Sequence, residues 1–411
     1  MKSDIPRLMR ERNLDALIID GPDGLDAANS PFTYFIGDVH IATGRIIITR
    51  EATTLVHGTM ERDEAAKTGL NLIDNGRYNI LGLMRKHNGD RLAAQLDLIR
   101  AQFADLGVAG RVAFYGANHQ NSTWALLNAI AREELCEVVG EYDDDIITKA
   151  RETKDAREVA EIRKACAATE TVIGETRDFL RRHAIKGGVL VQPSGDPLRI
   201  ADVKRFMRLS MVSAGLEASD AIFAIGRDAG VPHSAGTPTD LLETGKSIVF
   251  DIFPRLPGGY YADITRTWCI GHAPAWIEEG YAQVMEVHRT VAAMFDSTRP
   301  ASTYQEKACD IFEKYGHATL RKGGAGISSG YIHSLGHGFG LSVHEAPGMR
   351  NAGLGGDKPL PAGTVITNEP GLYYPDDARG GWGVRVEDDY WLNPETGRVE
   401  CLTEFDRSLL I

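Results

Sequence analysis

The chain has 411 residues, of which 43% are hydrophobic and 25% charged, and its net charge is −12. These values are those of globular proteins with two or three domains, so they exclude disordered, collagenous and low-complexity classes. Up to residue 150 the chain has 16 basic against 22 acidic side chains, and beyond it 29 against 35. Because neither part is basic, we expect no nucleic-acid surface and no anionic-membrane surface.

The cysteines are few, far apart and without a C-x-x-C pair, a pattern typical of reduced proteins rather than of disulfide frameworks or zinc ribbons. The N-terminal stretch has no apolar core of a signal peptide. No window of the sequence approaches the ~18 apolar residues that a membrane span needs. We therefore expect a soluble, cytoplasmic protein. The cysteines are Cys136, Cys166, Cys269, Cys309 and Cys401.

The first 150 residues alternate short apolar runs with helical periodicity, which predicts a layered α/β domain. Apolar residues at helical spacing between positions 92 and 106 predict a helix that stops at Gly107. We find no constellation of catalytic residue types here. The predicted strands are Leu14–Asp20, Arg45–Thr49, Thr53–His57 and Arg111–Tyr115.

A second domain is predicted from about residue 151 to residue 411. Asp155 and Glu158 have the spacing of a capping box, which predicts the start of a long amphipathic helix. Beyond that helix the pattern is α+β, with strand pairs and helices mixed rather than alternating. The predicted elements are strands at Ser247–Pro254, Tyr260–Ile270, Thr364–Tyr374 and Trp382–Leu392, and helices at Trp276–Phe295 and Tyr304–Tyr315.

Four acidic residues and a histidine interrupt apolar or glycine-rich segments of this second domain. They are Asp251 in IVFDIF, Asp263 in YYADITRTW, His337 in GHGFG, Glu369 in TNEPG and Glu387 in GVRVEDD. Each of them alone is an ordinary polar residue, but buried acids are costly unless they are paired or bind a metal. No matching Lys or Arg cluster lies beside them in the sequence, so two divalent cations are the simplest neutralising partners. Two such metals can hold a bridging hydroxide, the nucleophile of metal-assisted hydrolysis.

These motifs occur in the order of a known family. The pieces VFDIF, ADITRTW, VPH at Val231–His233, GHGFGLSVHEAP, TNEPGLY and VRVED resemble those of the pita-bread metallopeptidases. That family includes Xaa-Pro aminopeptidases, Xaa-Pro dipeptidases (prolidases) and methionine aminopeptidases. The resemblance covers most of residues 155–411 and implies a catalytic pita-bread domain at 151–411, preceded by a creatinase-type α/β domain at 1–150.

The resemblance also implies a role for each metal-binding residue. Asp251 would bind the first metal, His337 and Glu369 the second, and Asp263 and Glu387 would bridge the two. One histidine among carboxylates suits manganese, cobalt, zinc or iron better than calcium, and manganese is our first expectation.

The resemblance further assigns residues around the metals. His233 and His344 match positions that hold the scissile carbonyl and steady the tetrahedral intermediate, and Glu369 matches the proton shuttle. Arg385 would orient a ligand carboxylate, although a surface arginine is the alternative. Arg350 lies slightly beyond the place where prolidases hold the substrate carboxylate. That displacement leaves dipeptide specificity open and slightly favours longer peptides.

The expected function is therefore cleavage of the Xaa-Pro bond at the N-terminus of short peptides by a homodimer. One alternative keeps the metal site for a small non-peptide substrate, as an amide hydrolase or a lyase. Another is a non-catalytic binding protein of the same fold, which the intact ligand set argues against.

Overall fold

The computed structural model describes residues 1–22 and 29–411. These residues form two compact units, residues 1–150 and residues 151–411. None of the helices in the described part is both long and apolar enough to span a membrane. Each unit has its own apolar core.

The described part of the first unit is built on a six-stranded sheet in the order β4-β3-β2-β1-β5-β6. Its central strand β1 pairs antiparallel with β2 and parallel with β5. The four predicted strands are present, whereas the short strands β4 and β6 were not predicted because they bury little apolar surface. The strands are β1 (Ala16–Asp20), β2 (Gly44–Thr49), β3 (Thr53–His57), β4 (Asn71–Asp74), β5 (Arg111–Tyr115) and β6 (Glu137–Val139).

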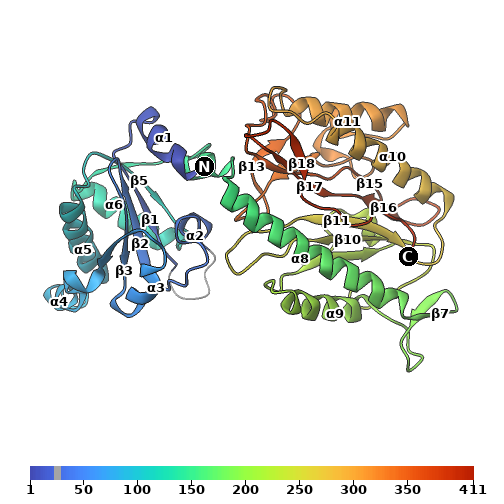
Figure 1. The fold of residues 1–411 in the computed structure, drawn as a ribbon, viewed down its shortest axis with the longest axis horizontal. Helices are drawn as coiled ribbons and strands as arrows, with labels where there is room; N and C mark the ends of the chain where they lie inside the picture. Colours follow the sequence, from blue (N-terminus) through green and yellow to red (C-terminus); the bar gives the residue numbers. More distant parts are fainter. Residues whose placement is uncertain (23–28) are drawn as a thin grey trace. The chain divides into compact units, whose positions relative to one another are not determined.

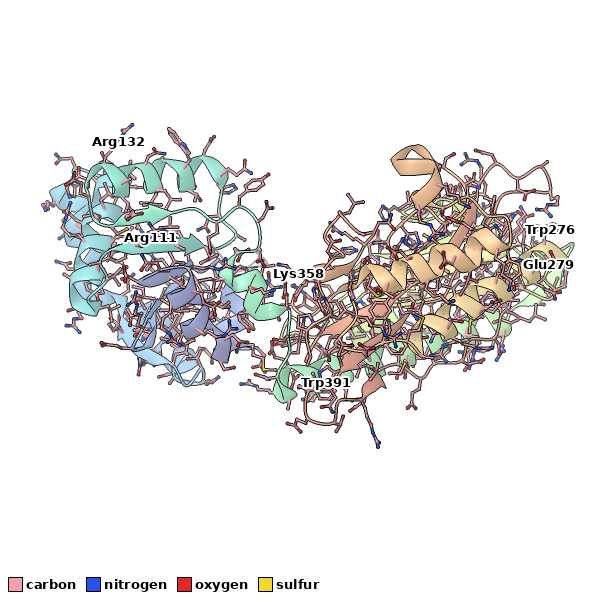
Figure 2. All side chains as sticks on the ribbon, turned by 90° about the horizontal axis from the view of Figure 1, so that it is seen from above. Arg111, Arg132, Trp276, Glu279, Lys358 and Trp391 are labelled. Atoms are coloured by element: carbon pink, nitrogen blue, oxygen red, sulfur yellow. The ribbon has the colours of Figure 1, made fainter. Side chains whose placement is uncertain are left out.

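Helices pack on this sheet (Figure 1). The predicted helix is α5, which is capped by the Asp90 side chain and ends at Gly107 with φ +66°, a conformation that favours glycine. Figure 2 marks Arg111 on β5 and Arg132 at the end of α6. The helices are α1 (Ile5–Glu11), α2 (Ser30–Ile36), α3 (Arg62–Ala66), α4 (Ile80–Lys86), α5 (Arg91–Leu106), α6 (Gln120–Arg132) and α7 (Ile146–Arg151).

The second unit places sheets between two pairs of helices (Figure 1). Helix α8 begins as predicted, because Asp155 and Glu158 form a reciprocal capping box. Its apolar face packs with α9 on β9, β10 and β11, while α10 and α11 cover the other strands. The helices are α8 (Ala156–Arg181), α9 (Ile200–Ser213), α10 (Ala275–Ala292), α11 (Ser302–Lys314) and α12 (Leu320–Gly323).

The strands of the second unit form a sheet β11-β10-β9, a sheet β13-β12-β14-β17-β18 and the hairpins β15-β16 and β7-β8. Every residue of β10 and β11 is buried. The strands are β7 (Ala184–Lys186), β8 (Val189–Val191), β9 (Ala221–Ile225), β10 (Ser247–Ile252), β11 (Ile264–Cys269), β12 (Gly336–Gly338), β13 (Glu345–Met349), β14 (Val365–Asn368), β15 (Gly371–Tyr374), β16 (Trp382–Arg385), β17 (Asp388–Leu392) and β18 (Val399–Cys401).

The prediction of continuous strands at Thr364–Tyr374 and Trp382–Leu392 is wrong, because each divides in two. β14 and β17 pair in one sheet, and β15 and β16 pair in another. The first break falls at Glu369 and Pro370, and a proline has no N–H for a ladder hydrogen bond. The second break includes Glu387. Both predicted ligands therefore lie where the chain passes from one sheet to the other.

Candidate metal centre

Asp251 and Asp263 come together through the antiparallel pairing of β10 and β11. Asp251 is paired directly with Thr265, and Asp263 lies two residues earlier, just before β11. Residues two apart in an extended segment share a face, so the two carboxylates are diagonal neighbours on one face. Both residues are buried.

The other predicted ligands converge on these two from three further segments. His337 Nε2 lies 3.6 Å from Asp263 Oδ2 and 3.5 Å from Glu369 Oε1. Ligand atoms of Asp263, His337 and Glu387 all lie within 4.8 Å of one another. Burial and the negative charges of Glu369 and Asp251 raise the pKa of Glu387. Together with the short distance between Asp263 and Glu387, this places the four acids in one cluster. Figure 1 shows the strands β10, β11, β16 and β17 that carry or flank these acids.

The imidazole of His337 is oriented as a metal ligand. Its Nδ1 lies 3.1 Å from the carbonyl oxygen of Gly338, which fixes the proton on Nδ1 and leaves the Nε2 lone pair facing the acids. Burial lowers the pKa of His337 to about 4, so the ring is neutral near pH 7. A neutral nitrogen lone pair that faces carboxylate oxygens fits a cation between them.

The four acids have the properties expected of groups that bind divalent cations. Burial raises the pKa of Asp251, Asp263 and Glu387 and raises that of Glu369 to about 8. Among the described residues, Asp251 Oδ1 and Glu387 Oε1 are buried without a hydrogen-bond partner. Such acceptor atoms are costly to bury unless a cation meets them, so this residue set fits a divalent-metal site.

Arg385 is buried, which excludes the alternative of a surface arginine. Its Nη2 forms an ion pair with Asp251 Oδ2, and its Nε donates to Thr265 Oγ1 at 3.1 Å. Thr265 Oγ1 in turn donates to Glu387 Oε2 at 2.7 Å. Arg385 and Thr265 therefore orient two of the acids, and Thr265 was not predicted because a buried threonine on a strand is ordinary.

A second missed residue is His333, four positions before His337. Its Nε2 lies 2.9 Å from the Tyr373 hydroxyl, and its Nδ1 lies 3.9 Å from Glu369 Oε2. The Tyr373 hydroxyl also accepts from Arg385 Nη1 at 3.0 Å, so these side chains form one connected group. The sequence does contain a signal for His333, because the segment YIHSLGHGFG has a second histidine four residues before His337. The segment is rich in glycine and does not form a helix.

His233 and His344 are exposed at the edge of the acidic cluster. The ring of His344 lies 4.2 Å from that of His337, measured between centroids. Burial is the largest influence on the Asp251 pKa, and the charges of His233 and His344 are among those that lower it. Both histidines therefore lie beside the cluster.

Arg350 is exposed just beyond β13. Its Nε lies 3.3 Å from the position that a Cβ on Gly348 would occupy, and Gly348 is the strand partner of His337. The arginine side chain thus folds back over a residue that lacks a side chain.

Comparisons with known proteins identify the family of the chain. The chain belongs to metallopeptidase family M24, whose profile matches residues 160–394. It is 30% identical to an Xaa-Pro dipeptidase of Pyrococcus furiosus over 270 residues, which cover 65% of this chain and 67% of that protein. It is 29% identical to the probable dipeptidase PepE of Mycobacterium tuberculosis over 248 residues, which are 59% of this chain and 57% of that protein.

Solved structures show the same fold over the full length. The Xaa-Pro dipeptidase from Bacillus anthracis superposes with a TM-score of 0.76 at 21% identity, covering 100% of this chain and 99% of that one. The X-Pro aminopeptidase from Thermotoga maritima MSB8 gives 0.74 at 22% identity, covering 98% and 99%. The predicted α+β fold of the pita-bread class is confirmed, as is the predicted family.

Proposed function

We propose that this chain is a metal-dependent peptidase that hydrolyses the bond between an N-terminal residue and a following proline. The observation that carries the proposal is the convergence of three buried carboxylates, the partly buried Glu369 and the Nε2 atom of His337. The names of its relatives among the Xaa-Pro dipeptidases support the substrate class. Proline has no N–H and restricts the chain, so its peptide bond calls for a specialised site.

Two divalent cations per chain would occupy the site, with manganese as the first expectation and cobalt, zinc or iron as alternatives. When bound, they supply a water of lowered pKa as the nucleophile and polarise the scissile carbonyl. Asp251 would hold one cation, His337 and Glu369 the other, and Asp263 and Glu387 would bridge them.

The remaining residues act on the substrate. His233 and His344 would donate N–H groups to the carbonyl oxygen as negative charge develops on it. Glu369 would take a proton from the attacking water and pass it to the leaving proline nitrogen. Arg385 holds Asp251 in place through their ion pair, and Arg350 would receive the free carboxylate of an Xaa-Pro dipeptide.

The test is a substrate panel on protein reconstituted with Mn²⁺, Co²⁺, Zn²⁺ or Fe²⁺ in turn. Ala-Pro and Ala-Pro-Ala should be cleaved after the first residue, and Ala-Ala should be cleaved poorly. Cleavage of Ala-Ala as fast as Ala-Pro would overturn the proline specificity. Failure on every peptide with metal bound would overturn the peptidase and point to a small amide or another small-molecule substrate. The homodimer and the cytoplasmic location stay predictions.

A further inference from the structure

A buried ion-pair cluster is centred on Glu345, the residue that follows His344. Glu345, the next residue in the chain, has a side chain that is 6% exposed. Its Oε2 lies 3.2 Å from Lys154 Nζ, and its Oε1 pairs with Arg151 Nη2. The backbone N–H of Ser342 also donates to Oε1 at 2.8 Å. Both carboxylate oxygens are therefore occupied by strong donors.

The two cationic side chains, Arg151 and Lys154, lie in the short segment that precedes helix α8. Hydrogen bonds hold this segment in place. Lys154 Nζ donates to the carbonyl of Arg151 at 2.8 Å, and the Lys154 backbone N–H donates to that of Gly363 at 2.9 Å. Lys154 is 1% exposed. A lysine this deeply buried is stable only where its charge is paired, so Glu345 has a fixed counter-charge.

The same contacts close the loop that carries His344. Arg151 Nη2 donates to Ser342 Oγ at 3.0 Å, and the N–H of Gly340 donates to the carbonyl of Ser342 at 3.1 Å. A Cβ on Gly340 would lie 2.9 Å from Lys154 Cε, so the loop packs directly on the lysine stem. The loop between His337 and Glu345 is thus held at both ends, by strand pairing at Gly338 and by the ion pairs at Glu345.

We propose that Glu345, held by Arg151 and Lys154, is a positioning residue that sets the place of His344 beside the acidic cluster. The inference rests on the proposed function, in which His344 donates to the substrate carbonyl. A carboxylate is needed because it accepts from two cations and a backbone N–H at once. A glutamine has one oxygen to accept with and would turn an amide NH₂ group toward a cation.

The test is a double-mutant cycle on the metal-loaded protein with Ala-Pro-Ala. Glu345→Gln should lower kcat by about 10- to 100-fold, the size of loss seen when a group that orients an active-site histidine is removed, while KM and metal content change little. In the His344→Ala background the same substitution should lower kcat less than about twofold, because the residue that it positions is gone.

Glu313 offers a matched control in the same unit. Its side chain is 9% exposed and pairs with Arg321 Nη2 at 2.7 Å and with Lys322 Nζ at 2.8 Å. Glu313→Gln should lower thermal stability as Glu345→Gln does, yet leave kcat unchanged. Equal losses of kcat in the two variants would show that Glu345 acts through general stability and would overturn the inference. Full additivity with His344→Ala would do the same.

Lys154 provides a second set of variants should Glu345→Gln fold poorly. Lys154→Met should lower kcat as Glu345→Gln does, and Lys154→Arg should restore it to within about threefold, because the cation is kept. If Lys154→Met kept full kcat, the inference would be wrong.

A readout that needs no substrate separates this inference from the proposed function. The NMR signals of the His344 ring, assigned by comparison with His344→Ala, should shift or broaden in Glu345→Gln and remain unchanged in Glu313→Gln. If wild-type protein cleaves no peptide, the proposed function fails while this measurement still tests the positioning. Unchanged His344 signals in Glu345→Gln would overturn the positioning alone.

Discussion

Two neighbouring acids, Glu387 and Asp388, are both buried, but their surroundings shift their pKa values in opposite directions. Asp388 Oδ1 accepts from Arg266 Nη2 at 2.8 Å and from Thr403 Oγ1 at 2.7 Å, and its Oδ2 accepts from Arg407 Nε at 2.6 Å. Burial alone would raise the Asp388 pKa, but nearby cations such as Arg266 and Arg407 outweigh it and hold that pKa well below its usual range.

Glu387 forms no such ion pair among the described residues, although the effect of burial on its pKa is opposed by the charge of the nearby Arg385, which lowers that pKa. Burial and the charges of Glu369 and Asp251 raise its pKa, and Thr265 donates the hydrogen bond to its Oε2. Its Oε1 is without a hydrogen-bond partner among the described residues. The difference teaches that a buried acid whose oxygens are all met by the protein's own donors is structural, whereas one left with an unmatched oxygen among other acids is suited to a cation from solution.

The largest expected effect comes from removing a bridging acid. Asp263→Ala should lower kcat/KM by about 10⁴-fold, since it removes a group on which the nucleophile depends. It should also lower the metal content by at least one ion per chain, as measured by elemental analysis after reconstitution. Full activity in Asp263→Ala, with no transition metal bound by the wild type, would contradict the metal site.

The pair of neighbouring acids can be compared directly by removing each charge in metal-free protein. Asp388→Asn should lower the free energy of unfolding by about 3–5 kcal/mol, because it leaves the buried Arg266 without its charged partner. Glu387→Gln should change it by less than about 1 kcal/mol, because burial and the neighbouring acids raise the pKa of Glu387 and the neutral acid is replaced by a neutral amide of similar shape. Urea denaturation measures the free energy of unfolding of both variants. Equal losses would show that Glu387 contributes to the stability of the fold as much as Asp388 does.

We expect His233 and His344 to act on the substrate and not to bind the metals. His233→Ala and His344→Ala should keep both metals and each lose about 3 kcal/mol of transition-state stabilisation, the size expected for one oxyanion donor. Metal content and kcat on Ala-Pro-Ala are the measurements. A variant that loses metal in parallel with kcat would identify that histidine as a ligand instead.

The acids of this site could be predicted because Asp251 stands inside a wholly apolar strand, where no structural role accounts for it. The choice of Glu387 over the next two acids in VEDD came from the resemblance, since alternation along a strand does not say which acid faces a metal. The strand breaks at Glu369 and at Glu387 were missed because each half continues the same apolar pattern while pairing in a different sheet. Contacts such as that of Thr265 with Glu387 depend on pairings far apart in sequence, which one sequence does not reveal.

The smallest predicted effect concerns Arg350, whose surroundings differ from those of both acids. Unlike Arg266 and Arg407, it is exposed and forms no ion pair within the described ranges 1–22 and 29–411. An arginine without an ion-pair partner can bind a substrate carboxylate at two points. The slight preference for longer peptides drawn from the sequence stays a prediction, which substitution of Arg350 tests.

Arg350→Ala should raise KM for Ala-Pro by about tenfold, which is about 1.4 kcal/mol, and that for Ala-Pro-Ala by less than about twofold. Ala-Pro presents its carboxylate directly after the proline, whereas the tripeptide carries it one residue farther away. Arg350→Lys is the matched variant, because it keeps the charge but loses the planar two-point geometry, so its KM for Ala-Pro should fall between the two. Steady-state kinetics on both peptides decides the matter. An equal change for the two peptides would mean that Arg350 does not read the carboxylate, and the cation that does would have to be sought elsewhere around the site.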